Sequence, residues 1–357
     1  MTSEQRRILT SIGVTLGDFP ESIGLAYTAP KLVMTLTQAA AGFSNPINMQ
    51  EESACFEAWC LIIKAQTSNP GLKIELYVDG ITVAGYPGGK PDNGHLGRFL
   101  YRILKFSEQY KQWFELSTAL GKIKDKFQNY LDTKSFETNA PSKEAEDDPD
   151  KLLNKGLESY VEQLLVDAGS NKTKILKLSS ASAIVGRQLP VGLYEGTKFK
   201  YNEVFTGGTS AADFWAVDGD IIKVYELKSK NPMVGIITEI FFYSNYVYDI
   251  FVEKGNHMVP YTPKKYYRNY DKIEGKKVQG IMLSDSDGWH PSLDELTRRK
   301  ITDIMNTNGT AGIIQYTFFK YNFKMVDCKC KLNKIYQATI SVEYTLSRKV
   351  SNSSSGL

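Results

Sequence analysis

The stretch that most constrains the fold of this chain is residues 207–230, GGTSAADFWAVDGDIIKVYELKSK. Two strands are expected here, residues 211–217 and residues 221–228. The Asp-Gly-Asp sequence between them is a strong short-range signal for a hairpin turn. We therefore expect the chain to contain an antiparallel β-hairpin at this point.

The length of the turn decides which side chains share a face of the hairpin. Side chains alternate between the two faces with period two, so Glu226 and Lys228 point to the same side. A two-residue turn at 219–220 places Asp213 directly opposite Glu226, and a turn at 218–219 places the two carboxylates diagonally on one face. A three-residue turn would put them on opposite faces.

A cluster of charged groups on one half-buried face needs a physical reason. Two carboxylates and a lysine are costly to bury unless they pair or hold a metal ion. A metal-dependent phosphodiesterase requires such an arrangement. The alternative is a solvated hairpin in which Glu226 and Lys228 merely pair. Tyr225 and Leu227 disfavour it, because they occupy the other face and leave no clearly solvent-facing side.

The length of 357 residues suits two domains. The clearest boundary is the acidic, proline-containing stretch TNAPSKEAEDDPD, which has no large apolar residue. It predicts a domain of residues 1–137, a solvated linker of residues 138–151 and a second domain of residues 152–350. Residues 351–357 are expected to form a disordered tail.

Charge is distributed unevenly between the two halves. Residues 1–150 carry 15 Lys and Arg against 19 Asp and Glu, whereas residues 151–357 carry 28 against 21. The half that contains the hairpin is therefore the basic one, which suits a polyanionic partner.

The chain has few cysteines and no sequence signal for a membrane. Cys55, Cys60, Cys328 and Cys330 lack the spacing of a zinc site. We expect reduced thiols and a cytoplasmic location. No apolar run has the length of a membrane span, and the N-terminus lacks a secretory apolar region, so no membrane association is expected.

Periodicity predicts further elements in both domains. In the first domain we expect a helix over 51–66, strands over 73–78 and 81–84, and helices over 96–131 with a break near Gly121. In the second we expect a helix over 152–168, a strand over 183–189, a helix from Asn231-Pro232 to 251, a strand over 278–283, a helix over 292–305 and strands over 312–319 and 338–344. Glu158 falls at the edge of the buried stripe of its helix, and Glu162 is expected further round toward solvent.

The expected elements of residues 152–283 are, in order, a helix, a strand, a two-stranded hairpin, a buried helix and a strand. This order resembles the PD-(D/E)XK nuclease superfamily, which includes many restriction endonucleases and archaeal Holliday-junction resolvases. GTSAADFWAV followed by VYELK is similar to the G-S-x-x-x-D and E-x-K strands of that group, although Ala212 stands where Pro is common. The segment GLESYVEQLLVDAG resembles the first helix of the resolvase-like members, whose glutamate corresponds to Glu158. The implied fold is α/β, a restriction-endonuclease-like αβββαβ mixed-sheet core with a separate N-terminal α/β domain.

The resemblance implies a catalytic set of Asp213, Glu226, Lys228 and Glu158. Asp213, Glu226, Glu158 and the carbonyl of Leu227 would hold Mg²⁺, with Mn²⁺ able to substitute. The implied activity is hydrolysis of DNA phosphodiester bonds, as in restriction or another anti-phage defence. Double-strand cutting usually needs two active sites, so a homodimer acting on double-stranded DNA is expected.

Other residues could contact the nucleic acid. Thr209 and Ser210 could meet a phosphate or simply cap a turn. The other candidates are Lys230, Lys264, Lys265 and Arg268, and the last three belong to a tyrosine-rich loop that could equally be solvated. Two alternatives stay open: a non-catalytic nucleic-acid-binding protein on the same fold, and a nuclease switched on by a ligand or partner that the N-terminal domain senses.

Overall fold

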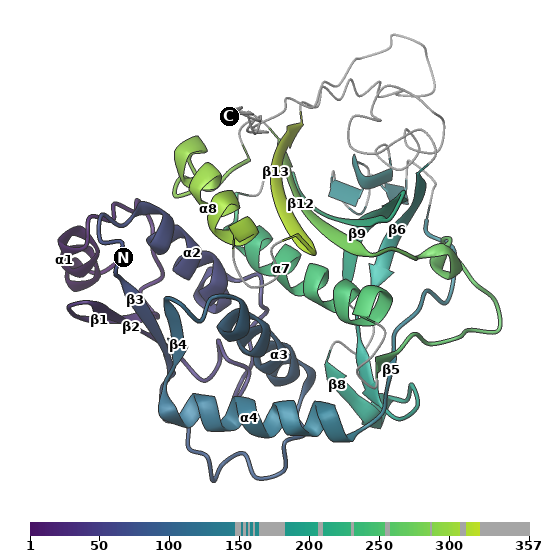
Figure 1. Ribbon diagram of the computed structural model, residues 1–357, viewed down its shortest axis with the longest axis horizontal. Coiled ribbons are helices and arrows are strands. Elements are labelled where there is room, and N and C mark those ends of the chain that lie inside the picture. Colours follow the sequence, from purple (N-terminus) through teal and green to yellow (C-terminus); the bar gives the residue numbers. More distant parts are fainter. Residues whose placement is uncertain are drawn as a thin grey trace, which may run out of the picture.

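The chain forms an α/β structure with three mixed sheets, drawn in Figure 1. The computed structural model describes residues 1–146, 151–152, 155, 158–159, 161–163, 183–205, 210–229, 232–253, 258–285, 288–307 and 312–321. The α/β class predicted from the sequence is confirmed. None of the helices in these ranges is both long enough and apolar enough to cross a membrane.

The first sheet belongs to the N-terminal part of the chain. Its order is β1-β2-β3-β4, with β1 antiparallel to β2 and the other neighbours parallel. Its strands are β1 Gly24–Thr28, β2 Lys31–Leu36, β3 Lys73–Val78 and β4 Phe114–Leu116. The helices of this part are α1 Ser3–Ser11, α2 Phe56–Gln66, α3 Gly94–Gln109 and α4 Thr118–Thr133, with a short 3₁₀ turn at Glu52–Ala54.

The second sheet contains the predicted hairpin at its centre. Its order is β13-β12-β10-β9-β6. Strand β9 pairs antiparallel with both β6 and β10, and β12 pairs parallel with both β10 and β13. The strands are β6 Ile184–Pro190, β9 Ala211–Asp218, β10 Ile221–Lys228, β12 Lys277–Asp285 and β13 Ile314–Tyr321. Along the chain, helix α7, Gly235–Val247, connects β10 to β12, and helix α8, Glu295–Thr307, connects β12 to β13. Parallel neighbours need such crossover connections.

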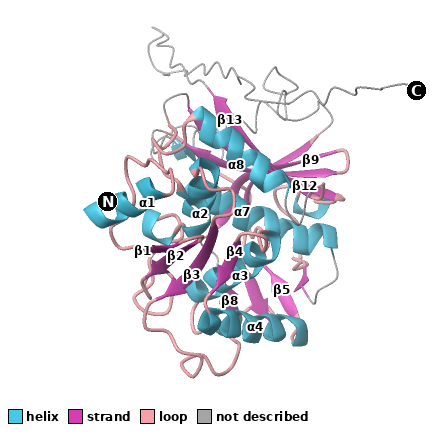
Figure 2. Cartoon of the chain, turned by 60° about the vertical axis from the view of Figure 1, so that its left-hand side comes forward, coloured by secondary structure: helices cyan, strands magenta, loops and turns pink. Residues whose placement is uncertain are grey.

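The third sheet joins strands from both parts of the chain. Its order is β11-β5-β7-β8, and β5, Phe136–Thr138, comes from the end of the N-terminal part. The other strands are β7 Leu193–Glu195, β8 Glu203–Phe205 and β11 Met258–Val259. Figure 2 shows β8 and β5 beside α4, below the larger sheet.

Helix α7 is buried on every side because both parts of the chain pack around it. Its sequence GIITEIFFYSNYV is apolar nearly all round, as the sequence predicts for a buried helix. Tyr101 of α3 packs edge-on against Phe242 of α7, with ring centroids 5.7 Å apart. A single hydrophobic core therefore extends from the N-terminal sheet through α2, α3 and α7 to the second sheet.

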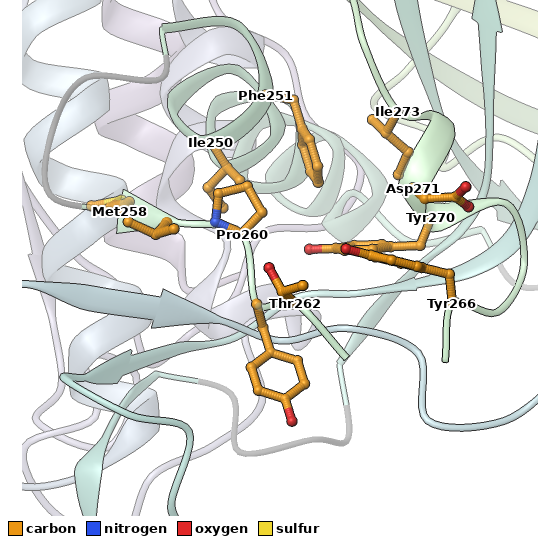
Figure 3. Close-up of a pocket in the computed structure, with 11 residues that line it drawn as sticks. Ile250, Phe251, Met258, Pro260, Thr262, Tyr266, Tyr270, Asp271 and Ile273 are labelled. Atoms are coloured by element: carbon orange, nitrogen blue, oxygen red, sulfur yellow. The ribbon is translucent and has the colours of Figure 1, made fainter. Parts of the chain in front are cut away.

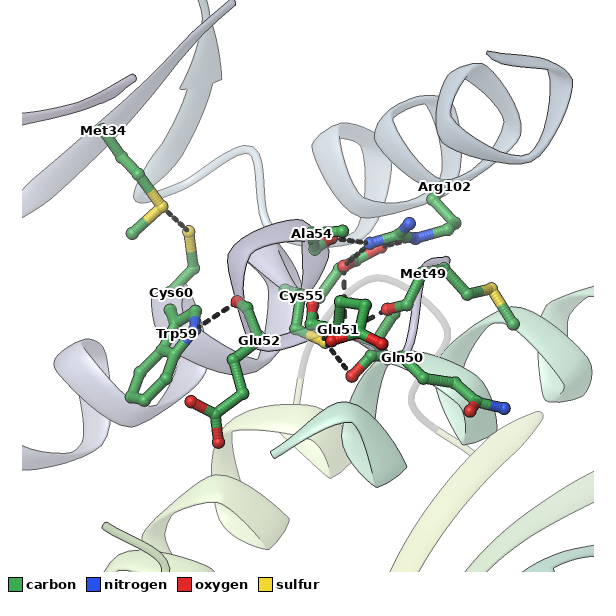
Figure 4. Close-up of polar contacts among 12 residues, drawn as sticks. Met34, Met49, Gln50, Glu51, Glu52, Ala54, Cys55, Trp59, Cys60 and Arg102 are labelled. Atoms are coloured by element: carbon green, nitrogen blue, oxygen red, sulfur yellow. Dashed lines mark hydrogen bonds and ion pairs between the residues drawn. The ribbon is translucent and has the colours of Figure 1, made fainter. Parts of the chain in front are cut away.

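A buried ion pair also connects these helices. Arg102 of α3 donates from Nε to Glu57 of α2 at 2.6 Å. Thr238 of α7 donates to the same carboxylate at 3.1 Å. Figure 4 shows the Arg102 guanidinium directed toward Ala54, whose carbonyl accepts from Nη2 at 2.8 Å. Buried charges are tolerated only when paired and hydrogen-bonded in this way.

The predicted elements of the second domain are largely confirmed. Strands β6, β9, β10, β12 and β13 and helix α8 match their predicted positions within a few residues. The strand predicted over 338–344 and the tail 351–357 lie outside the described residues. Helix α7 begins at Gly235, three residues after the predicted Pro232.

Two predictions for the first domain are wrong. Residues 81–84 form an irregular loop rather than a strand. The break in the helical region lies at β4 and not at Gly121, because the Ser117 hydroxyl accepts from Leu120 N–H and begins a new helix there. The predicted linker also starts later than residue 138, since residues 138–141 are buried.

Candidate active site

The turn of the hairpin contains two residues, Gly219 and Asp220, because Asp218 pairs with Ile221. Gly219 has φ +65°, a conformation that glycine adopts without steric cost and that two-residue hairpin turns require. The pairing runs as far as Phe214 and Tyr225. Extended by one residue on each strand, this register puts Asp213 opposite Glu226, as expected for a 219–220 turn.

Asp213 and Glu226 lie close together at the buried end of the hairpin. Leu227 N–H donates to Asp213 Oδ2 at 2.6 Å. Glu226 is only 2% exposed, and its Oε2 is buried without a hydrogen-bond partner among the described residues. An orphaned carboxylate oxygen in this setting is costly, so a cation at this position would be favoured.

Lys228 lies between two carboxylates. Its Nζ is 2.8 Å from Glu226 Oε1 and 2.9 Å from Glu239 Oε2. Glu239 comes from α7, where it is the only charged residue, and its other oxygen accepts from Gln50. The sequence signal for Glu239 is a single carboxylate inside a largely apolar helix.

Glu158 reaches the end of strand β10. It lies in a helical stretch that precedes β6, and its Oε2 accepts from Ser229 N–H at 3.2 Å. The hairpin and this helix therefore bring Glu158, Asp213, Glu226 and Lys228 together, as the sequence predicts.

Glu162 is a correction to the sequence prediction, which placed it toward solvent. It is buried, and Arg187 donates to its Oε2 from Nη2 at 2.9 Å. Gln188 donates to the same oxygen at 2.8 Å. The angular position of Glu162 on its helix does not show that Arg187 of β6 pairs with it. The prediction is wrong because this burial depends on tertiary packing.

A cleft of about 280 Å³ lies over these groups. Glu158, Asp213, Glu226, Lys228 and Glu239 line it from the side of the second sheet and α7. Ser210, Ala211 and Tyr243 complete this side, and the N-terminal part lines the other side with Asn48, Met49, Gln50, His95 and Arg98. No sequence pattern singled out these N-terminal residues, because their role depends on how α3 and the 48–50 segment pack against α7.

Burial and mutual repulsion set the protonation of the carboxylates. Burial raises the pKa of Asp213, and the nearby Glu162 raises it further. Burial likewise raises the pKa of Glu226, and Asp213 and Glu239 add to the effect. Burial lowers the pKa of Lys228, but Glu226 and Glu239 outweigh it and the net shift is upward. Lys228 is therefore held as a cation.

The residues at this site fit a divalent cation by their chemistry. Carboxylates and a backbone carbonyl are the oxygen ligands that Mg²⁺ prefers. Glu158, Asp213, Glu226 and Glu239 face a single lysine here, and Glu226 Oε2 lacks a partner. Across the described ranges, however, no three acidic, His or Cys side chains are already assembled to hold an ion. Asp213 and Glu226 are engaged by Leu227 N–H and Lys228, so ion binding would require an exchange of these partners.

The predicted nucleic-acid contacts are dispersed. Ser210 lines the cleft, with its hydroxyl 3.1 Å from that of Tyr243. Lys264 and Lys265 are exposed, whereas Arg268 donates to the Gln188 carbonyl at 2.7 Å. Thr209 and Lys230 lie outside the described residues.

The loop that carries Lys264, Lys265 and Arg268 borders a second cavity, of about 340 Å³, and not the acidic cleft. Figure 3 shows Tyr266, Tyr270 and Phe251 lining this cavity. The three basic residues are therefore separate from the carboxylates in the fold, although the sequence places them in the same domain.

The chain was compared with protein-family models, curated proteins and solved structures, and none of them matched. The geometry of the cleft is therefore the basis for assigning a function.

Proposed function

We propose that this protein is a metal-dependent nuclease that hydrolyses phosphodiester bonds, with DNA as its substrate. The observation that carries the proposal is the two-residue turn, which sets Asp213 opposite Glu226 and beside Lys228 in one buried cleft. Structural ion pairs also occur in proteins, but here a carboxylate oxygen stays unpaired within the described residues. Perturbed titratable groups that gather in a cleft are typical of active sites.

The order of elements supports a restriction-endonuclease-like core. A helical stretch that includes Glu158 is followed by β6, the β9–β10 hairpin, α7 and β12, with the third-sheet strands β7 and β8 inserted before β9 and β11 inserted before β12. This is the αβββαβ order that the sequence resemblance implies. The antiparallel β6, β9 and β10 with a parallel β12 provide the mixed sheet of that core.

Each group has a distinct role in the proposed reaction. Asp213, Glu226, Glu158 and the Leu227 carbonyl would hold Mg²⁺, which when bound lowers the pKa of water and neutralises phosphate charge. Lys228, held protonated by Glu226 and Glu239, would stabilise negative charge that develops on the phosphate oxygens. Glu239 orients Lys228 from α7.

The test is plasmid cleavage in Mg²⁺ or Mn²⁺ against EDTA. We expect cleavage in either metal, none in EDTA, and none by the variants Asp213→Ala, Glu226→Ala and Lys228→Ala. Glu295→Ala on the exposed face of α8 removes a carboxylate away from the cleft and serves as the control. Full Mg²⁺-dependent activity in Glu226→Ala would sink the assignment.

Two further measurements refine the proposal. Cleavage of a random DNA library, with the ends sequenced, separates site-specific restriction from structure-specific and non-specific cutting. Sedimentation with and without DNA tests the homodimer that double-strand cutting calls for. Binding of DNA without cleavage in any divalent metal would instead indicate a non-catalytic nucleic-acid-binding protein.

A further inference from the structure

An arginine without a counter-ion lines the acidic cleft from the N-terminal part. Arg98 lies in the second turn of α3 and is half-buried. Its Nε is buried without a hydrogen-bond partner, and its guanidinium makes no ion pair within the ranges that the structure covers. Glu239 and Glu203 act on it only through longer-range attraction.

His95 holds this arginine in place. Arg98 Nη2 donates to His95 Nδ1 at 2.9 Å, one turn earlier on α3. Burial, and then the Arg98 charge, lower the pKa of His95, so the ring is neutral near pH 7 and can accept this bond. Asn93 caps the same helix by accepting from His95 and Leu96 N–H, which orders the backbone that carries both side chains.

Such a charge is costly unless a ligand pairs with it. Removing a guanidinium from water without a partner is unfavourable, and burial lowers the pKa of Arg98 accordingly. In the next turn of α3, the buried charge of Arg102 is compensated by its ion pair with Glu57. Arg98 differs in that it faces the cleft, where an anion from outside can reach it.

The groups that line the cleft favour a phosphate as the anion that pairs with Arg98. A guanidinium presents a planar fork of donors that matches phosphate oxygens. Asp213, Glu226 and Glu239 repel an isolated anion from the rest of the cleft, so a ligand must present phosphate at Arg98 and tolerate carboxylates beside it. A nucleic-acid strand does so when a divalent cation bridges its next phosphate to the carboxylates.

We propose that Arg98, positioned by His95, binds a backbone phosphate of the nucleic-acid substrate next to the phosphodiester that is cut. The N-terminal part then forms one side of the substrate site. This inference rests on the proposed nuclease function, but its test does not depend on cleavage.

The test measures binding of a fluorescent 24-nucleotide strand and its duplex in Mg²⁺, at several salt concentrations. The proteins carry Glu226→Gln, which is expected to prevent cutting. In that background we compare Arg98→Ala, Arg98→Lys and Arg6→Ala. Arg6 is exposed on α1 and provides the same loss of charge away from the cleft.

We expect Arg98→Ala to raise Kd about tenfold or more and to lower the slope of log K against log salt by about 0.7–0.9, the value for one phosphate contact. Arg98→Lys should retain part of the affinity because a point charge remains. Arg6→Ala should change neither quantity. The melting temperature of Arg98→Ala should fall only slightly, because in the described structure the side chain has no ion pair to lose and only the hydrogen bond to His95.

Other outcomes separate the two proposals. Equal binding by Arg98→Ala and Arg6→Ala overturns the phosphate contact even if the protein cuts DNA. A thermal shift of the arginine-containing protein by inorganic phosphate, without binding of either oligonucleotide, overturns it in favour of a free-anion site. A loss of binding in Arg98→Ala with no cleavage by the unmodified chain in any metal supports the contact and removes the nuclease function.

Discussion

Glu239 shows how one side chain can determine the state of another. It lies 1% exposed in α7 and shares Lys228 with Glu226. Without Glu239, Lys228 keeps one partner of two and loses the contact that holds it from the helix side. In the proposed reaction Glu239 acts through Lys228, which it contacts at 2.9 Å, and is therefore a positioning residue.

We expect Glu239→Gln to lower kcat about 10- to 100-fold, the usual range for residues that orient a group at a metal site. KM should change little, because phosphate binding is assigned to other residues. Glu239→Asp should restore part of kcat by returning the charge. Steady-state cleavage of a labelled duplex measures both parameters, with Glu295→Gln as the control. A rise in KM at constant kcat would contradict a positioning role.

The carboxylates make the metal-free protein sensitive to pH. The native pKa of Asp213 is raised above its unfolded value, so the native state holds its proton more tightly. The stability contributed by this proton is present below about pH 4 and is lost as pH rises through the native pKa. Asp213→Asn removes the charge and keeps an oxygen that can accept from Leu227 N–H.

We therefore expect the melting temperature of Asp213→Asn in EDTA to exceed that of the unmodified protein by a margin that is larger at pH 8 than at pH 5. Mg²⁺ should raise the melting temperature of the unmodified protein more than that of the variant. Differential scanning fluorimetry measures both. The control is Asp18→Asn, an exposed position. A constant margin across this pH range would contradict a raised native pKa.

At the scale of elements, Gly235 brings the N-terminal part to the cleft. It is the first residue of α7, and a Cβ built on it would lie 2.5 Å from the Gln50 carbonyl oxygen. Because the obstacle is backbone, the 48–50 segment would have to move. That segment lines the cleft, and Gln50 donates to Glu239.

We expect Gly235→Ala to destabilise the protein by about 1–3 kcal/mol, as overpacking does, and to lower cleavage per folded molecule. Gly121→Ala is the matched control, since Gly121 lies in the first turn of α4 with open space around it. Gly121→Ala should leave the free energy of unfolding unchanged or raise it slightly. Urea unfolding and cleavage rates measure the two effects. Unchanged activity in folded Gly235→Ala would show that the 48–50 segment is not needed.

The hairpin could be predicted from the sequence because its determinants are local. Period-two alternation and the Asp-Gly-Asp turn define β9 and β10, and Gly219 supplies the positive φ. The carboxylates at Asp213 and Glu226 then follow from the register. Glu158 is half-buried, in line with the helix edge that periodicity predicts, whereas the same periodicity misplaced Glu162.

Other parts of the site could not be predicted in this way. Arg98 and Gln50 join the cleft only through the packing of α3 and the 48–50 segment on α7. The same applies to Glu162, whose burial depends on Arg187 from another element. Strands β1 and β2 were missed because their region is rich in turn residues and lacks clear periodicity.

At the scale of the whole molecule, the two parts predicted as separate domains share one core. Hydrophobic residues of α2, α3 and α7 form a continuous cluster with the second sheet. The Arg102–Glu57 pair, with Thr238, joins all three helices inside it. The cleft depends on this contact, because α3 carries Arg98 only one turn before Arg102.

This shared core leads to a prediction about cooperativity. Glu57→Gln leaves Arg102 as an uncompensated buried charge, which typically costs about 3–5 kcal/mol. Because the charge lies where both parts meet, we expect the loss to appear in one unfolding transition of the whole molecule. Trp59 reports on α2 and Trp215 on β9, so single-tryptophan versions follow the two parts separately in urea.

Both tryptophan probes should show the same midpoint, shifted by the same amount in Glu57→Gln, as a two-state transition requires. The control is Glu4→Gln, which breaks the exposed pair with Arg7 and should leave the midpoint unchanged. Arg98 should then lose its effect on oligonucleotide binding at the urea concentration where both probes unfold. Two midpoints, with only the Trp59 transition shifted, would show instead that the N-terminal part folds independently and that the cleft forms by docking of two stable units.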